Sequence, residues 1–251
     1  MSRVQSIERA FAVLTVLTDG PIGVTEVADR ADLPKSTAAR MLASLVREGA
    51  VEQVPGDTRY RLGPRIDALA SGLVATRSLV AVARPHLVEL AASVGEVAGL
   101  SVPDGDLIHY VEQVDSDHPV GVRDWTGARL AIHGVSSGLA VLALRPPAEI
   151  DAYLARPLER FTDRTMTDPD QLRTRLQRIV LDGYAWTNGE YTEDISSVAA
   201  AIADASGEAV AAIHVHGPSY RFPAVGREAA LGREVARAAN LIAGTLRQVP
   251  S

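Results

Sequence analysis

The sequence predicts an α+β protein with two domains, a small one in residues 1–64 and a larger one in residues 79–251. Apolar residues recur at helical spacing in the first part, and the two-residue period of strands begins at Val97. Charge divides in a similar way. Residues 1–65 carry nine Lys and Arg against eight Asp and Glu, whereas the rest of the chain carries sixteen against twenty-three. This distribution is typical of a small module that contacts a polyanion, attached to an acidic body.

Three short helices are predicted before residue 50. Apolar residues three or four positions apart predict the first over residues 6–18, and Asp19-Gly20-Pro21 ends it. The second is predicted over residues 25–31. The third follows the turn Asp32-Leu33-Pro34 and is predicted over residues 36–48. The apolar face of the third helix carries Ala38, Met41, Leu42 and Leu45.

Two short strands, residues 51–54 and 59–62, are predicted on either side of the turn Pro55-Gly56-Asp57-Thr58. Three helices followed by such a hairpin are typical of a winged helix-turn-helix, whose third helix enters the major groove of DNA. Hydroxyl groups at a helix N-terminus suit phosphate contacts, and arginine commonly reads guanine. A three-helix packing unit without a role in DNA binding is the alternative. The predicted DNA-binding residues are Lys35, Ser36, Thr37, Arg40, Ser44 and Arg47 on the third helix, and Arg59 and Arg61 on the hairpin.

A linker helix is predicted over residues 65–78, and its helical pattern is clearest over residues 66–75. A further helical pattern covers residues 79–93. Proline lacks the N–H group that a helix interior needs, so Pro85 is tolerated within this pattern if the helix starts close to it. Beyond it, strand pairs interleave with helices, as in an α/β sensor-type domain. The predicted strands are 97–102 with 107–113 and 198–203 with 210–215, and the predicted helices are 137–144, 148–154, 169–182 and 225–247.

Composition excludes several kinds of site. The chain has no cysteine, which removes disulfides, thiolate zinc sites and cysteine nucleophiles. It lacks a Gly-x-Ser-x-Gly elbow, a phosphate loop and a dinucleotide fingerprint. His133 near Ser136 and Ser137 suggests a hydrolase, but spacing fixes no acid as a third partner. We therefore expect no enzyme activity, cofactor or metal. The chain has no signal peptide and no uninterrupted apolar run of ~18 residues, so we expect a cytoplasmic protein without a membrane partner.

Five segments resemble the IclR family of bacterial transcription regulators, in order and at the family's spacing. They are Gln5–Ala10 (QSIERA), Asp32–Leu42 (DLPKSTAARML), Arg59–Arg65 (RYRLGPR), Arg156–Thr162 (RPLERFT) and Leu181–Tyr184 (LDGY). The resemblance implies a homodimer or dimer of dimers that binds operator DNA. It also implies a C-terminal GAF-like domain that binds a small effector. Family members repress or activate catabolic operons, and we expect a repressor.

The resemblance also implies where an effector binds. In the family, pocket residues come from a loop before a helix, a position after the Gly-Tyr motif, a position before the next strand and two positions on that strand. The corresponding residues here are Gly134, Val135 and Ser136; Thr187 or Asn188; Ser197; and His214 with His216. Since this chain departs from the family pattern at three of the four places, small α-keto acids are less expected here than for a typical family member. We expect an aromatic or small organic acid or amide as the effector.

His214 and His216 can also be interpreted without the family. Strand geometry places side chains two positions apart on the same face, so both imidazoles face one way. They form a polar cavity wall, or they lie on a solvent-facing strand surface. Metal binding with His133 or Glu190 is a third possibility, because imidazole is a good zinc ligand.

Two further questions stay open in the sequence. Trp125 belongs to the core by default, and a place in a loop over the pocket is the alternative. A ligand-responsive DNA-binding regulator is the expected function. An activator of the same fold, or a sensor that acts through protein contacts alone, is the alternative.

Overall fold

The computed structural model describes residues 5–116, 118 and 122–247, without the side chains of residues 71–75. Two compact units are present, Met1–Arg77 and Ser78–Ser251, and each is described by itself. None of the helices in the described part of the chain combines the length and apolar character that crossing a bilayer requires.

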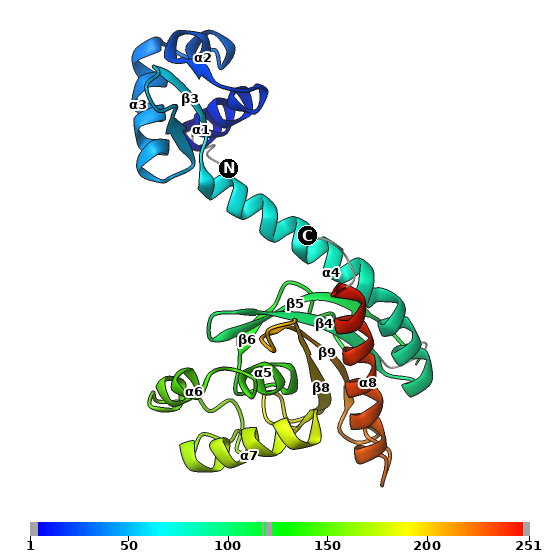
Figure 1. Cartoon of the computed structure of the whole chain (residues 1–251). Coiled ribbons are helices and arrows are strands. Elements are labelled where there is room, and N and C mark those ends of the chain that lie inside the picture. The colour runs from blue at the N-terminus through cyan, green and yellow to red at the C-terminus, as the bar shows by residue number, and fades with distance from the viewer. Residues whose placement is uncertain (1–4, 117, 119–121, 248–251) are drawn as a thin grey trace. The chain divides into compact units, whose positions relative to one another are not determined.

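The N-terminal unit contains three helices and a small antiparallel sheet (Figure 1). The helices α1 (Gln5–Val16), α2 (Val24–Arg30) and α3 (Lys35–Arg47) lie where they were predicted. The hairpin strands are β2 (Val51–Gln53) and β3 (Arg59–Leu62), and the two-residue strand β1 (Ile22–Gly23), which was not predicted, pairs with β3. A 3-10 turn, Leu17–Asp19, extends α1. The core of the unit consists of Val13, Leu17, Val27, Ala28, Ala38, Leu42 and Val51.

Helix α4 (Pro64–Val94) is a single continuous helix of 31 residues that contains Pro85. The expectation of two separate helices, the second starting close to Pro85, was therefore wrong. Proline in a helix interior removes one backbone hydrogen bond, here to the carbonyl of Ala81. Leu79, Ala83 and Leu87 lie on both sides of that position and are buried in the core of the C-terminal unit, so packing maintains the helix through the proline.

The C-terminal unit is built on a six-stranded antiparallel sheet in the order β6-β5-β4-β9-β8-β7. The two predicted hairpins are present and somewhat longer than predicted. They lie side by side, because β4 pairs with β9. Strands β6 and β7 at the edges were not predicted. The strands are β4 (Val97–Asp104), β5 (Leu107–Val114), β6 (Arg129–Ala131), β7 (Ala185–Asn188), β8 (Ile195–Ala203) and β9 (Ala209–Pro218).

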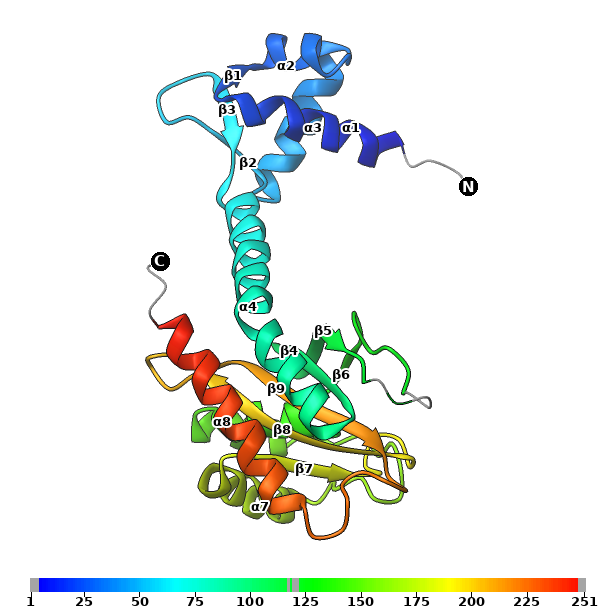
Figure 2. The same cartoon turned by 90° about the vertical axis from the view of Figure 1, so that its right-hand side faces the viewer.

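Helices cover both faces of this sheet (Figures 1 and 2). The second half of α4 and α8 (Glu228–Leu246) pack on one face, and α5 (Ser136–Leu142), α6 (Pro147–Leu154) and α7 (Pro169–Asp182) pack on the other. Helix α8 begins at Glu228 and not at residue 225, because Gly226 takes a left-handed backbone conformation with φ of 78°. The unit therefore has two cores separated by the sheet.

Successive side chains of β9 point to opposite faces of the sheet, so they pack alternately in the two cores. Ile213 and Val215 pack in the α4 and α8 core, and Ala212 packs with α5 on the opposite face. His214 and His216 have the parity of Ala212, so they face the α5 side. This places two imidazoles inside the layer that contains the pocket described next.

Candidate functional site

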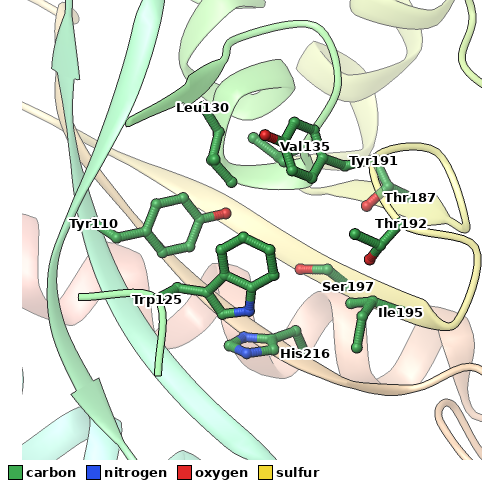
Figure 3. A pocket seen from close by; sticks show the side chains of 10 residues that line it. All are labelled: Tyr110, Trp125, Leu130, Val135, Thr187, Tyr191, Thr192, Ile195, Ser197 and His216. Atoms are coloured by element: carbon green, nitrogen blue, oxygen red, sulfur yellow. The ribbon is translucent and has the colours of Figure 1, made fainter. Parts of the chain in front are cut away.

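A small cavity, partly open to solvent, lies on the α5 side of the sheet in the C-terminal unit. Figure 3 shows its side chains, with the hydroxyl of Tyr110 directed in among them. Strands β5, β6, β7, β8 and β9 and the loops that follow β5, β6 and β7 contribute its walls. The lining residues are Tyr110, Trp125, Leu130, Val135, Thr187, Tyr191, Thr192, Ile195, Ser197 and His216.

One wall is polar because of the sheet register. Thr187 of β7 pairs with Ser197 of β8, and Ser197 pairs with His216 of β9. Three polar side chains on neighbouring strands therefore lie in one row across the sheet. The Oγ atoms of Ser197 and Ser136 are 2.6 Å apart, which ties the polar row to the first turn of α5.

Three aromatic side chains, Tyr110, Trp125 and Tyr191, form a second part of the lining. Tyr110 is buried, which raises the pKa of its hydroxyl to about 12, and that hydroxyl lies 3.3 Å from the Oγ of Ser137. Trp125 packs edge-on against Tyr191, with ring centroids 6.1 Å apart. The guanidinium of Arg123 lies 3.9 Å from the centroid of the Trp125 ring, and the Trp125 backbone N–H donates to the side chain of Gln113. Trp125 therefore lines the cavity, as the alternative interpretation of the sequence had it.

His214 and His216 are stacked with ring centroids 5.5 Å apart, and Tyr110 packs against His214 at 4.8 Å. Their exposed fractions are 1% and 4%, so the solvent-facing interpretation was wrong. Within the described structure, Nδ1 of His214 and Nε2 of His216 are buried without a hydrogen-bond partner. Burial lowers the pKa of His214 well below its ordinary value and that of His216 to about 4, so both rings are neutral at pH 7.

The metal interpretation is not supported by the positions of its proposed ligands. His133 is bonded at both ring nitrogens, to the hydroxyl of Tyr153 at 2.7 Å and the carbonyl of Glu159 at 2.8 Å. Glu190 forms a two-pronged ion pair with Arg175. Among the residues that the structure describes, no three His, Asp or Glu side chains are grouped to hold a metal ion.

The predicted DNA-binding residues form an exposed polar surface of the N-terminal unit. Lys35, Ser36, Arg40 and Arg47 of α3 are exposed, whereas Thr37 and Ser44 are half-buried. The Arg47 guanidinium donates to the Oγ of Ser44 at 3.3 Å. Arg40 has neither an ion pair nor a hydrogen-bond partner among the described side chains.

The hairpin exposes Arg59 and Arg61 and turns the residues between and after them toward the core. Each arginine already has an acidic partner. Arg59 pairs with Asp57 at 2.6 Å and Arg61 with Glu52 at 2.6 Å. The sequence had not revealed this pairing, because Glu52 lies on the neighbouring strand, directly opposite Arg61.

Comparison with known families covers most of the chain. Residues 6–55 match the IclR helix-turn-helix domain, and residues 72–243 match the bacterial transcriptional regulator IclR C-terminal domain. The chain belongs to the IclR family. The resemblance seen in the sequence and the predicted two-domain α+β fold are both confirmed.

Three curated relatives of this IclR-family regulator are transcriptional regulators. HTH-type transcriptional regulator BhcR of Paracoccus denitrificans is 34% identical over 87% of this chain and 79% of its own length. HTH-type transcriptional regulator Rv1719 of Mycobacterium tuberculosis is 35% identical, with coverage of 91% and 87%. Transcriptional repressor IclR of Escherichia coli is 29% identical, with coverage of 88% and 82%.

Two solved structures are similar over nearly the whole chain. A protein of Rhodococcus sp. RHA1, RHA06195, described as a transcriptional regulator, has a TM-score of 0.68 and 32% identity, with coverage of 99% and 100%. An IclR homologue of Microbacterium hydrocarbonoxydans was crystallised with 4-hydroxybenzoate. Its TM-score is 0.62 and its identity 29%, with coverage of 96% and 99%.

The structure brings some of the effector residues predicted for this IclR-family regulator to the cavity and places others elsewhere. Val135, Thr187, Ser197 and His216 line it, and Ser136 reaches it through Ser197. Three others do not line it. Gly134 lies under Phe161 and Tyr191, His214 lies behind His216, and Asn188 is exposed and accepts from Arg164 and Ser196.

Sequence reasoning missed five residues of the cavity, Tyr110, Leu130, Tyr191, Thr192 and Ile195. Tyr110, Leu130 and Ile195 are apolar or aromatic strand residues, which in the sequence are indistinguishable from core residues; Tyr191 and Thr192 lie in the loop between β7 and β8. One signal was available in the sequence, because alternate residues of β5 lie on the same face of the sheet. Ile108 and Tyr110 share a face that packs toward α5, so Tyr110 lies in the same layer as the two histidines.

Proposed function

We propose that this regulator is a repressor of a catabolic operon that binds operator DNA through α3 and the β2–β3 hairpin and responds to a small aromatic acid in the cavity. The observation that carries the proposal is the cavity itself, which has aromatic walls and a polar row. Flat walls from Tyr110, Trp125 and Tyr191 suit a planar ring. Hydroxyl groups of Thr187 and Ser197 can donate to a carboxylate. The binding of 4-hydroxybenzoate by the Microbacterium homologue supports this chemical class.

Each domain has its own role in the proposal. Residues 1–64 bind DNA, residues 65–78 link, and residues 79–251 bind the effector. In the DNA-binding domain, we place α3 in the major groove with Arg40 at a base edge and with Ser36 and Thr37 at phosphates. The repressor role is supported by the relative of Escherichia coli that is itself a repressor.

A homodimer, or a dimer of dimers, is part of the proposal. A single winged helix buries too little DNA for tight specific binding, so a dimer is expected to read a pseudo-palindromic operator. Helix α1 exposes two large apolar side chains four residues apart, Ile7 (56%) and Phe11 (65%). Such a stripe supports pairing through α1.

Arg40→Ala tests the DNA-binding half of the proposal. We expect a loss of about 1–3 kcal/mol, or roughly 5- to 150-fold, in affinity for the DNA upstream of the gene, because Arg40 is exposed and unengaged on α3. Fluorescence anisotropy with DNA fragments that carry single base-pair substitutions measures this loss of affinity. The variant should lose its preference for one base at a single position of the operator. Arg178→Ala on α7 makes the same change in charge in the C-terminal unit and should have no effect. A sensor that acts through protein contacts alone would leave this DNA unbound even in the wild type.

Two variants of the hairpin test its contact with DNA, and they are expected to change DNA binding in opposite directions. Arg61→Ala should lower the slope of log affinity against log salt by about one, because one phosphate contact is lost. Glu52→Gln should raise affinity up to ~5-fold at low salt, because it frees Arg61 from an exposed ion pair worth at most about 1 kcal/mol. Glu149→Gln on α6 is the matched control for charge. A salt slope unchanged in Arg61→Ala would show that Arg61 does not contact phosphate.

A further inference from the structure

Among the residues that the structure describes, those lining the cavity include no permanent positive charge with which to hold an acid. None of its ten lining residues is lysine or arginine, and His216 is the only one of them that can become a cation near neutral pH. A carboxylate that leaves water for a buried site needs a compensating charge as well as hydrogen bonds. An aromatic acid therefore enters this cavity with its charge uncompensated, unless a proton accompanies it.

His216 is placed to receive that proton. It lines the cavity beside Ser197, its exposed fraction is only 4%, and its Nε2 atom has no partner among the described residues. His214 is stacked behind it and has an unpartnered Nδ1 atom of its own. A neutral imidazole offers one donor and one acceptor, whereas an imidazolium offers two donors. Protonation therefore gives the pair an additional N–H donor for an acceptor such as a carboxylate.

We propose that the cavity takes up an organic acid together with one proton from solvent, and that the His214–His216 pair holds this proton while the acid is bound. The inference rests on the proposed function, since it assumes that an aromatic acid binds here. The balance is simple: one N–H bond forms on an imidazole, the carboxylate stays ionised, and the occupied site carries no net charge. The effector class is thus an acid rather than an amide.

The charged and titratable groups around the pair are consistent with one proton and not two. Asp115, just after β5, favours the charged form of His216, and the two imidazoles repel each other when both are charged. Tyr110 of β5 stays protonated, because burial raises its pKa to about 12. Glu96, just before β4, is engaged by Arg221 with contacts of 2.5 and 2.9 Å. The other facing groups are Tyr191 after β7, the Ser197 hydroxyl of β8, and Trp125, whose ring centroid lies 3.9 Å from the guanidinium of Arg123.

The sign of the pH dependence follows from the proton count. The empty site is unprotonated above pH 4, because burial holds the pKa of His216 at about 4. A bound carboxylate favours the imidazolium and raises that pKa. The complex then holds one more proton than the free components, so acid affinity falls as pH rises. The fall approaches tenfold per pH unit between the pKa of the empty site and that of the complex.

Calorimetric proton counting tests the inference directly. The full-length protein is titrated at pH 6 with 4-hydroxybenzoate and with 4-hydroxybenzamide, in buffers of different ionisation enthalpy. We expect uptake approaching one proton with the acid and none with the amide. His216→Gln should abolish the uptake and weaken acid binding at least tenfold, while amide affinity changes less than about threefold. His109→Gln, which changes a histidine of β5 outside the cavity lining, should keep the uptake.

The outcomes separate the two proposals. If 4-hydroxybenzoate binds without proton uptake, the inference is overturned and the proposed function stands. If neither compound binds, the proposed aromatic effector is overturned, and the inference with it. The wild-type proton count tests the uptake itself even if His216→Gln fails to fold.

Discussion

Gly138→Ala is expected to destabilise the C-terminal unit by about 3 kcal/mol or more. A Cβ atom at Gly138 of α5 would lie 2.1 Å from the carbonyl oxygen of Ile132 and 2.7 Å from its Cα. Both contacts are with backbone, and Ile132 is fully buried and donates its N–H to the carbonyl of Asp106. The clash therefore cannot be relieved by rotating a side chain, so α5 must move away from the sheet.

The same displacement would disrupt the cavity, because α5 carries Ser136, whose hydroxyl contacts Ser197. Denaturant unfolding followed by tryptophan fluorescence measures the decrease in the free energy of unfolding of the C-terminal unit, because both tryptophans, Trp125 and Trp186, lie in that unit. Gly244→Ala on α8 is the matched control. Beyond its own helix turn, no heavy atom of the described residues lies within 4 Å of its added Cβ, and alanine in a helix should stabilise by about 0.5–1 kcal/mol. Equal unfolding midpoints for the two variants would contradict the packing described here.

Whether a helix or strand could be predicted depended on how many repeats of apolar spacing its sequence contains. Helix α3 and the β8–β9 hairpin carry several apolar repeats and could be predicted from sequence. Strands β1 and β6, of two and three residues, are too short to show a period. Pro85 was misinterpreted because a local rule about one hydrogen bond was weighed without the packing of Leu79 and Leu87 around it.

The cavity could be predicted only in part, and for a physical reason. Thr187, Ser197 and His216 are polar residues in apolar strands, which is unusual enough to notice, and family positions pointed to them as well. Tyr110 and Tyr191 contribute aromatic surface, which core packing explains equally well in a sequence. The pairing of Glu52 with Arg61 depends on the register of β2 and β3, which only the structure provides.

The second large effect concerns communication between the cavity and DNA. Saturation with 4-hydroxybenzoate is expected to weaken operator affinity by 5- to 150-fold, which corresponds to a coupling of about 1–3 kcal/mol. The physical requirement is that the acid binds one of two arrangements of the protein more tightly than the other, and that operator DNA prefers the other arrangement. His216→Ala should bind operator normally and lose this response, because His216 lines the cavity and lies in the C-terminal unit.

The most direct test measures occupancy of the cavity and operator binding in one titration. Trp186→Phe leaves Trp125, which lines the cavity, as the sole tryptophan, so its fluorescence reports the bound acid. The anisotropy of a labelled fragment from upstream of the gene reports DNA binding in the same sample. The account predicts that operator affinity falls at least fivefold over the 4-hydroxybenzoate concentrations that change Trp125 fluorescence. Saturation of Trp125 fluorescence with operator affinity unchanged would contradict it.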